Sequence, residues 1–228
     1  MPKQQRKIDG GEKAGGIPKL KAVNLFGAPG VGKSASRSGL FWLMKIRGIS
    51  VEEVSEFAKY LVLAKRMWQL QSDQLYVLAK QHHKMMILHG SYEFAVTDSP
   101  LMLAGYYYEE IARSGGNASP SEDFVSFCQD YAESFDNLNI FLTRDFRKSD
   151  FEQQGRVHGI SDSERIDAEQ REFLTKNNQQ WVDIDLDSVS PYALLERMIA
   201  EIEVKWPGTL GRAQGLAPGS PSSTGLYI

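Results

Sequence analysis

The segment from Gly27 to Ser34 reads G-x-x-x-x-G-K-S, and it constrains the fold of this 228-residue chain more than any other feature. An apolar run, residues 22–26, precedes it, and apolar residues at helical spacing follow it over residues 34–47. Glycines let successive backbone N–H groups turn toward one anion, and a helix start adds its positive dipole end. The context therefore predicts a phosphate-binding loop at the end of a central strand. An ordinary glycine-rich turn is the alternative, and it does not account for the flanking strand and helix.

We expect this loop to bind ATP together with Mg²⁺. In such a loop the lysine, Lys33, reaches the β and γ phosphates, and the hydroxyl of Ser34 ligates the metal. The predicted contacts with ATP come from consecutive residues: Gly27, Ala28, Pro29, Gly30, Val31, Gly32, Lys33, Ser34 and Ala35.

The remaining hydrophobic pattern alternates strands with helices, which predicts an α/β fold with a mostly parallel sheet covered on both faces. The predicted strands are 22–26, 51–55, 94–98, 139–143 and 181–185. The predicted helices are 34–47, 56–70, 73–88, 101–112, 122–135, 161–176 and 191–205. We expect one domain over residues 21–206, a flexible basic arm over residues 1–20, and a disordered tail rich in Gly, Pro and Ser over residues 207–228.

The net charge of -3 is not typical of a nucleic-acid-binding protein, although residues 1–21 carry a local charge of +4. That basic arm either touches a phosphate backbone or is a solvated leader. No apolar run reaches the roughly 18 residues of a membrane span, so we expect no membrane partner and a cytoplasmic protein.

Two carboxylates at predicted strand ends are candidates for the chemistry of phosphoryl transfer. Glu56 follows the second strand and is placed to orient or deprotonate an acceptor hydroxyl. Asp98 ends the third strand and is a candidate for holding Mg²⁺ with Ser34, or for sharing the base role with Glu56. No glutamate follows Asp98, which argues against a motor ATPase. The alternatives are that Glu56 only starts a helix and that Asp98 only forms a turn.

The polar stretch after the fourth strand predicts an arginine-bearing lid that closes over the transferring phosphoryl group. Arg156 is the first candidate for a catalytic cation and Arg147 the second. A solvated loop, with acidic residues between the arginines, is the alternative.

The helices after the second strand are candidates for binding the acceptor. Lys59, Arg66, Gln74 and Tyr76 are the predicted substrate contacts, because amides read base edges and aromatic rings stack on bases. The alternative is the solvated face of two helices. Three consecutive tyrosines, residues 106–108, cannot share one helical face, so we expect one ring in the core and another at the acceptor cleft.

Several segments together resemble a known group: residues 26–34, 54–59 (Val-Ser-Glu-Phe-Ala-Lys), 73–81, 97–101 (Thr-Asp-Ser-Pro-Leu) and 155–167. They resemble the small P-loop kinases of tailed bacteriophages, among them the 5-hydroxymethyluracil DNA kinases, over roughly residues 20–205. The wider similarity is to deoxynucleoside, nucleoside-monophosphate and ribosylnicotinamide kinases.

This resemblance implies the P-loop NTPase fold with the sheet order 2-3-1-4-5. It implies that Glu56 contacts the acceptor, that Asp98 lies near the metal, and that Arg147 and Arg156 belong to the lid. Phe57 stands where many deoxynucleoside kinases have proline, and Ser-Pro follows Asp98 in place of arginine, so a free nucleoside is the less favoured substrate.

The leading hypothesis is an ATP-dependent kinase that acts on the hydroxymethyl group of 5-hydroxymethyluracil in phage DNA, in the host cytoplasm. The alternatives are a nucleoside or deoxynucleoside-monophosphate kinase, and a DNA-associated ATPase or nucleotide switch. The partners would be the nucleotide and DNA, and the sequence assigns no oligomeric state.

Overall fold

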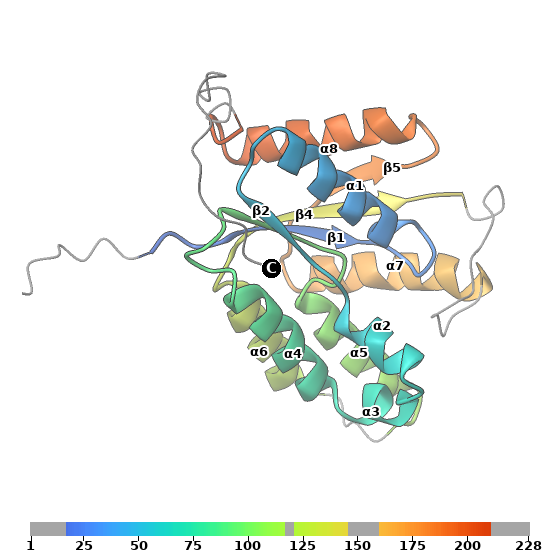
Figure 1. The fold of residues 1–228 in the computed structure, drawn as a ribbon. Helices are drawn as coiled ribbons and strands as arrows, with labels where there is room; N and C mark the ends of the chain where they lie inside the picture. Colours follow the sequence, from blue (N-terminus) through green and yellow to red (C-terminus); the bar gives the residue numbers. More distant parts are fainter. Residues whose placement is uncertain (1–16, 117–120, 146–159, 211–228) are drawn as a thin grey trace, which may run out of the picture.

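The computed structural model describes residues 17–116, 121–145 and 160–210, which form a five-stranded sheet between two layers of helices (Figure 1). The strand order is β2-β3-β1-β4-β5, and all neighbouring strands in it are parallel, which confirms the predicted sheet. The strands are β1 (Lys21–Phe26), β2 (Val51–Val54), β3 (Phe94–Thr97), β4 (Asp136–Thr143) and β5 (Val182–Asp185).

The central strands are buried on both faces, as parallel sheets require. In β1 the side chains of Val23, Leu25 and Phe26 are almost fully buried, and all four residues of β3 are buried. Val23 pairs with Val96 on one side and with Leu138 on the other. Because all strands run the same way, the loops that follow them meet at one edge, and the candidate residues after β1, β2 and β3 come together there.

Helices cover both faces of the sheet (Figure 1). α1 (Lys33–Ile46) and α8 (Pro191–Lys205) pack against each other on one face. The other face carries α4 (Gln74–Met86), α5 (Met102–Arg113), α6 (Glu122–Ala132) and α7 (Ile160–Lys176). Two short helices, α2 (Phe57–Leu63) and α3 (Met67–Ser72), contact α4.

The predicted helix over residues 56–70 is wrong in one respect, because the chain breaks it into α2 and α3. Lys65 adopts a left-handed backbone conformation with φ of 57°. The N–H of Arg66 donates to the carbonyl of Leu61 at 2.8 Å, and the N–H of Lys65 donates to the carbonyl of Val62 at 3.0 Å. This pair of bonds ends a helix, usually at a glycine. Lysine takes that position here, so the sequence gives no sign of the break.

The boundary between α6 and β4 also differs from the prediction. α6 ends at Ala132, and β4 begins at Asp136, three residues before the predicted start. The side-chain amide of Asn137 donates to the carbonyls of Ala132 and Phe135, at 2.7 and 3.1 Å. These bonds satisfy the end of the helix while the backbone of Asn137 already pairs with β1.

In the part of the chain that the structure describes, no helix is long and apolar enough to cross a bilayer. Most of the predicted arm and of the predicted tail lies outside the described residues. Residues 17–20 and 207–210 are described, and Leu20 is part of the hydrophobic core.

Candidate active site

The phosphate-binding loop lies where it was predicted, between β1 and α1. Gly27 has φ of 130°, and a Cβ atom on it would lie 2.5 Å from the carbonyl oxygen of Leu142, so only glycine fits. The ammonium of Lys33 donates to the carbonyls of Gly27 and Ala28, at 2.6 and 3.0 Å. The loop therefore wraps around its own lysine, with Gly32 as the left-handed N-cap of α1.

Helix α7 supports the loop from outside. The side chain of Gln170 accepts a hydrogen bond from the N–H of Gly27 at 3.3 Å, and the hydroxyl of Ser163 donates to the carbonyl of Pro29 at 2.8 Å. Both side chains are almost fully buried. Neither residue was a candidate from the sequence, because each is more than 130 positions from its partner and carries no local motif.

Asp98 is the centre of a buried hydrogen-bond network. Its carboxylate accepts from the hydroxyl of Ser34 at 2.7 Å, from the guanidinium of Arg37 at 2.8 Å, and from the backbone N–H of Glu56 at 3.1 Å. Arg37 also donates to Glu53 at 3.0 Å. Asp98 is therefore more than a turn-forming residue: it joins α1, β3 and the start of α2.

The donor set fits Mg²⁺ held mainly by phosphates and water. The described residues contain no group of three His, Cys, Asp or Glu side chains that could hold a metal ion. Mg²⁺ keeps several waters and uses one or two protein ligands beside substrate phosphates. The hydroxyl of Ser34, which donates its proton to Asp98, has lone pairs free for such a ligand role.

Glu56 faces the cavity and does not cap α2. It is the N-cap residue of that helix, but its side chain accepts no capping hydrogen bond. Burial raises the pKa of its carboxyl above the ordinary 4.5, the charge of Lys33 lowers it, and the charge of Asp98 raises it. A raised pKa suits a carboxylate that takes a proton from a hydroxyl near neutral pH.

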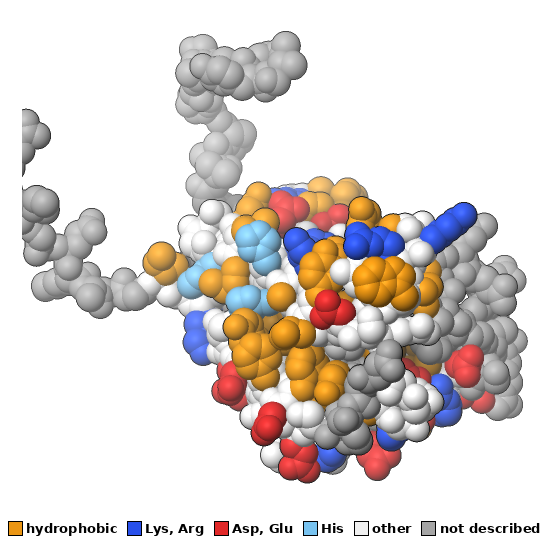
Figure 2. Space-filling view, turned by 90° about the horizontal axis from the view of Figure 1, so that it is seen from below, with side chains coloured by type: hydrophobic (Ala, Val, Ile, Leu, Met, Phe, Trp, Pro, Cys, Tyr) orange, Lys and Arg blue, Asp and Glu red, His pale blue; other side chains and the backbone are white. Residues whose placement is uncertain are grey.

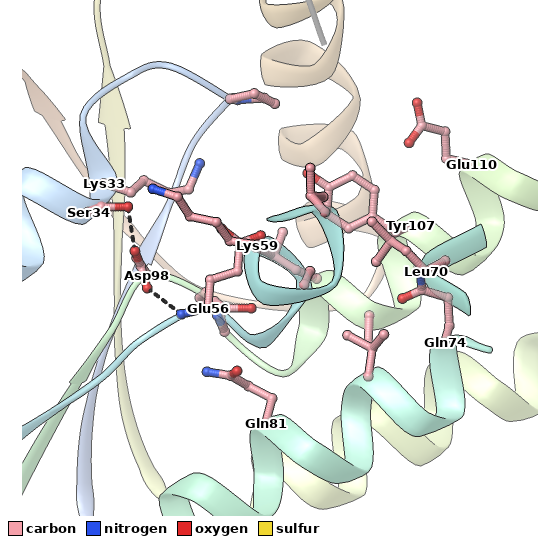
Figure 3. A pocket seen from close by; sticks show the side chains of 18 of the residues that line it. Lys33, Ser34, Glu56, Lys59, Leu70, Gln74, Gln81, Asp98, Tyr107 and Glu110 are labelled. Carbon is pink, nitrogen blue, oxygen red and sulfur yellow. Dashed lines mark hydrogen bonds between the residues drawn. The ribbon is translucent and has the colours of Figure 1, made fainter. Parts of the chain in front are cut away.

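One cavity of about 490 Å³ joins the phosphate-binding loop to the helices α2–α5. Figure 3 shows Lys33, Ser34 and Asp98 at one end, Gln74, Tyr107 and Glu110 at the other, and Glu56 between them. The far end is largely apolar, and the side chains that line it there include Val62, Met67, Leu70, Val77, Leu103 and Ile111. We call this half the acceptor end.

A few polar groups with defined partners line the cavity between Glu56 and the acceptor end. Gln81 is buried and bridges two elements, since it accepts from the N–H of Phe57 at 3.1 Å and donates to the hydroxyl of Thr97 at 3.2 Å. Gln74 donates to the carbonyl of Leu70 at 2.6 Å. Burial raises the pKa of Tyr107, and the charges of Glu56 and Glu110 add to this. Tyr107 therefore stays protonated and can donate.

The structure brings most of the sequence-predicted residues to the cavity. Pro29, Gly30, Gly32, Lys33, Ser34 and Ala35 line it, as do Glu56, Lys59, Gln74 and Asp98. Gly27, Ala28 and Val31 build the loop without lining the cavity. Arg66 and Tyr76 do not line it either: they lie on the outer side of the same helices. Arg147 and Arg156 fall outside the described residues.

Arg144 also lies at the phosphate-binding loop, although it was not among the candidate lid arginines. It follows β4 and lines the cavity. A Cβ atom on Gly32 would lie 3.9 Å from its Nη2. Its buried Nε has no hydrogen-bond partner among the described residues and lies 3.7 Å from the carboxylate of Asp187. Arg144 thus has donor capacity to offer an anion bound at the loop.

No protein-family model matches the sequence, and no curated protein matches it. Many solved structures match the chain, among them two that align with most of it. A deoxyadenosine kinase from M. mycoides, with the products dCMP and a flexible dCDP bound, has 15% identity and a TM-score of 0.55 over 80% of this chain and 99% of the other. The Mycobacterium tuberculosis APS kinase CysC, as a cysteine-to-alanine mutant, has 13% identity and a TM-score of 0.42 over 82% and 99%.

The chain has the P-loop NTPase fold. The strand order, the loop geometry and the similarity to the deoxyadenosine kinase agree on this point. At 15% identity that similarity extends to the fold and no further. The finer resemblance to phage DNA kinases stays a prediction.

Proposed function

We propose that this protein is an ATP-dependent kinase whose acceptor is a hydroxyl on a single nucleoside unit. The best candidate is the hydroxymethyl group of 5-hydroxymethyluracil in DNA. The observation that carries the proposal is the continuous cavity, which leads from the phosphate-binding loop past Glu56 to an apolar end lined by amides and a tyrosine. An ATPase without an acceptor would have no use for this second half.

The residues at the loop fit MgATP, which would supply the transferred phosphoryl group. Backbone N–H groups between Gly27 and Ser34 would bind phosphate oxygens, and Lys33 would exchange its carbonyl partners for the phosphates. Ser34 would ligate Mg²⁺, with its hydroxyl oriented by Asp98. Arg144 would donate to the phosphates from the side of β4, where it follows the charge that develops during transfer.

Glu56 is the proposed general base. The acceptor oxygen forms a bond to the γ-phosphorus while the bond from that phosphorus to the β–γ bridging oxygen breaks, and ADP leaves. The proton of the acceptor hydroxyl goes to Glu56. The raised pKa of this carboxyl supports the assignment, because a stronger base accepts the proton more readily.

The shape of the acceptor end supports a nucleoside unit. Ligand cavities are typically about 300–1,000 Å³, and the observed 490 Å³ includes the phosphate-binding loop. A base within duplex DNA cannot enter such a space, so hydroxymethyluracil would enter from a single strand or after extrusion from the helix. Gln74 and Tyr107 line this part of the cavity, and they would contact the edge or the face of the base.

A free nucleoside kinase is the second candidate, and the cavity volume of about 490 Å³ favours it, because this volume suits a small ligand. A nucleoside-monophosphate kinase is less well supported. Of the described residues that line the cavity, Arg144 is the single arginine, and it lies at the phosphate-binding loop. Beyond the loop the cavity carries the carboxylates Glu56 and Glu110, which would repel an acceptor phosphate, beside the cation Lys59.

The test is phosphoryl transfer from γ-labelled ATP to a panel of acceptors. The panel contains hydroxymethyluracil in single-stranded and duplex DNA, the free hydroxymethyl nucleoside, thymidine, deoxyadenosine and their monophosphates. Lys33→Ala serves as the inactive control. Label in the DNA supports the leading proposal, and label in a free nucleoside alone replaces it by the second candidate. Phosphate release that no acceptor alters would overturn the kinase proposal.

A further inference from the structure

The helices α2, α3 and α4 have two different faces. Their inner face lines the acceptor end of the cavity through residues such as Val62, Leu70 and Val77. Their outer face is open to solvent. Lys59 belongs to both, because it lines the cavity and is exposed. A molecule bound on the outer face would therefore lie next to the entrance of the cavity.

The segment that forms these helices is strongly basic. Residues 57–89 contain five Lys and Arg and a single carboxylate, a net charge of +4, whereas the whole chain carries -3. The rest of the chain therefore carries a net charge of -7. The cations are Lys59, Lys65, Arg66, Lys80 and Lys84.

These cations form no ion pair with a carboxylate in the described part of the chain. Elsewhere in the structure lysines pair with carboxylates, as Lys21 does with Glu93 at 2.6 Å and Lys176 with Glu109 at 3.3 Å. Within the described residues, none of the five cations of residues 57–89 forms such a pair. An unpaired cluster keeps its positive potential for an anionic partner.

Aromatic rings lie among these cations. Tyr60 and Trp68 are 59% and 65% exposed. Tyr76 packs edge-on against Phe57 with 5.4 Å between ring centroids, and the ammonium of Lys80 lies 5.6 Å from the Tyr76 ring. Figure 2 shows blue Lys and Arg side chains beside large orange ones on this side of the molecule. Exposed rings between cations are the pattern by which proteins bind single-stranded nucleic acid.

We infer that the outer face of α2–α4, defined by Tyr60, Lys65, Arg66, Trp68, Tyr76 and Lys80, binds the DNA strand next to the acceptor nucleotide. The cations bind its phosphates, and the exposed rings stack on its unpaired bases. This inference rests on the proposed function, since the acceptor nucleotide then occupies the adjoining cavity. Arg66 and Tyr76, which do not line the cavity, would then contact the substrate on this outer face.

Lys65 allows a test that separates DNA binding from folding. Its left-handed backbone, with φ of 57°, suits glycine better than lysine. Lys65→Gly therefore removes one cation while the melting temperature stays the same or rises. Trp68→Ala removes an exposed ring at little cost to the core. Matched controls on the other side of the sheet are Arg197→Ala on α8 and Trp42→Ala on α1, both at exposed side chains.

The measurement is fluorescence anisotropy of a labelled single-stranded oligonucleotide that contains one hydroxymethyluracil, over a range of salt concentrations. Each lost cation should reduce the slope of log affinity against log salt by about 0.7. The double variant Lys65→Gly/Lys80→Ala should reduce it by about 1.4. Trp68→Ala should weaken binding about tenfold. Both controls should bind like the wild type.

The same variants in the transfer assay separate this inference from the proposed function. The KM for the oligonucleotide should rise, while the KM for the free hydroxymethyl nucleoside stays constant. Unchanged DNA binding in the Lys65 and Trp68 variants, or equal losses in the controls, overturns the binding face even if DNA is phosphorylated. Loss of binding as expected, without transfer to any acceptor, supports the face and overturns the kinase proposal.

Discussion

Replacing Glu56 by glutamine should abolish most of the phosphoryl transfer while leaving ATP binding intact. The amide keeps the size of the side chain but cannot take the proton of the acceptor hydroxyl. The backbone N–H that donates to Asp98 is unchanged, so the network around Ser34 persists. A general base contributes about 10²–10⁴-fold, which corresponds to about 2.7–5.4 kcal/mol in the activation barrier. We expect kcat to fall within this range.

The same substitution should stabilise the protein at neutral pH. Burial raises the pKa of Glu56 above 4.5, so the folded state binds this proton more tightly than the unfolded chain does. Stability contributed by this group is therefore highest at low pH and falls as the pH rises from 4.5 to the raised pKa. At neutral pH the charged carboxylate is therefore less favourable in the folded protein than in the unfolded chain, and this costs the folded state free energy. Glu56→Gln removes that loss, so its advantage should appear at pH 7 and vanish near pH 4.

The assays are steady-state transfer kinetics, ATP binding by calorimetry, and urea denaturation at pH 4 and pH 7. The control is Glu52→Gln, on β2 but outside the cavity. The transfer rate of the wild type should rise as the pH passes the raised pKa of Glu56. The rate of the Glu56→Gln variant should not show this rise. A kcat within threefold of wild type would refute the base assignment. A variant less stable than wild type at pH 7 would refute the buried-charge reasoning.

Four further substitutions test the loop and its surroundings. Lys33→Ala should lower kcat at least about 10²-fold; a wild-type rate would mean that the ammonium stays on its carbonyl partners in the ATP complex. Asp98→Asn should lower kcat more than it lowers ATP affinity, as kinetics and calorimetry together will show, and the reverse order would remove it from the catalytic set. Gly27→Ala should destabilise the fold by about 1–3 kcal/mol, as measured by urea denaturation. The control Gly208→Ala should destabilise it less, because nothing lies within 4 Å of the added Cβ atom. Arg144→Ala should raise the KM for ATP about tenfold without changing the KM for the acceptor, and equal effects on both would place the arginine elsewhere.

The parts of the site that could be predicted depend on local patterns. The glycines and lysine of residues 27–34 define a loop whose geometry is repeated wherever a strand and a helix flank it. Glu56 and Asp98 were found because parallel strands end at one edge of a sheet. The tyrosine run behaved as its spacing predicted, since Tyr106 is buried in the core and Tyr107 lines the cavity.

The parts that could not be predicted depend on contacts between distant segments. Gln170 and Ser163 support the loop from a charged helix whose pattern shows only that one face is buried. Gln81 looked like one of several polar residues on α4, and only the packing of α4 against β3 shows that it bridges Phe57 and Thr97. The break at Lys65 was missed because no glycine marks it.

The bonds of Asp98 have a consequence for the order of events at the two substrates. One carboxylate accepts both from the hydroxyl of Ser34, the proposed ligand of Mg²⁺, and from the backbone N–H of Glu56, at the wall of the proposed acceptor site. A nucleotide that shifts Ser34 by a few tenths of an ångström would therefore also shift the carboxylate of Asp98. The start of α2, which is hydrogen-bonded to the same carboxylate, would move with it. If one such bond contributes about 1 kcal/mol, each substrate should increase the affinity for the other by about fivefold. This coupling should disappear in a variant whose residue 98 cannot accept hydrogen bonds from both Ser34 and the N–H of Glu56.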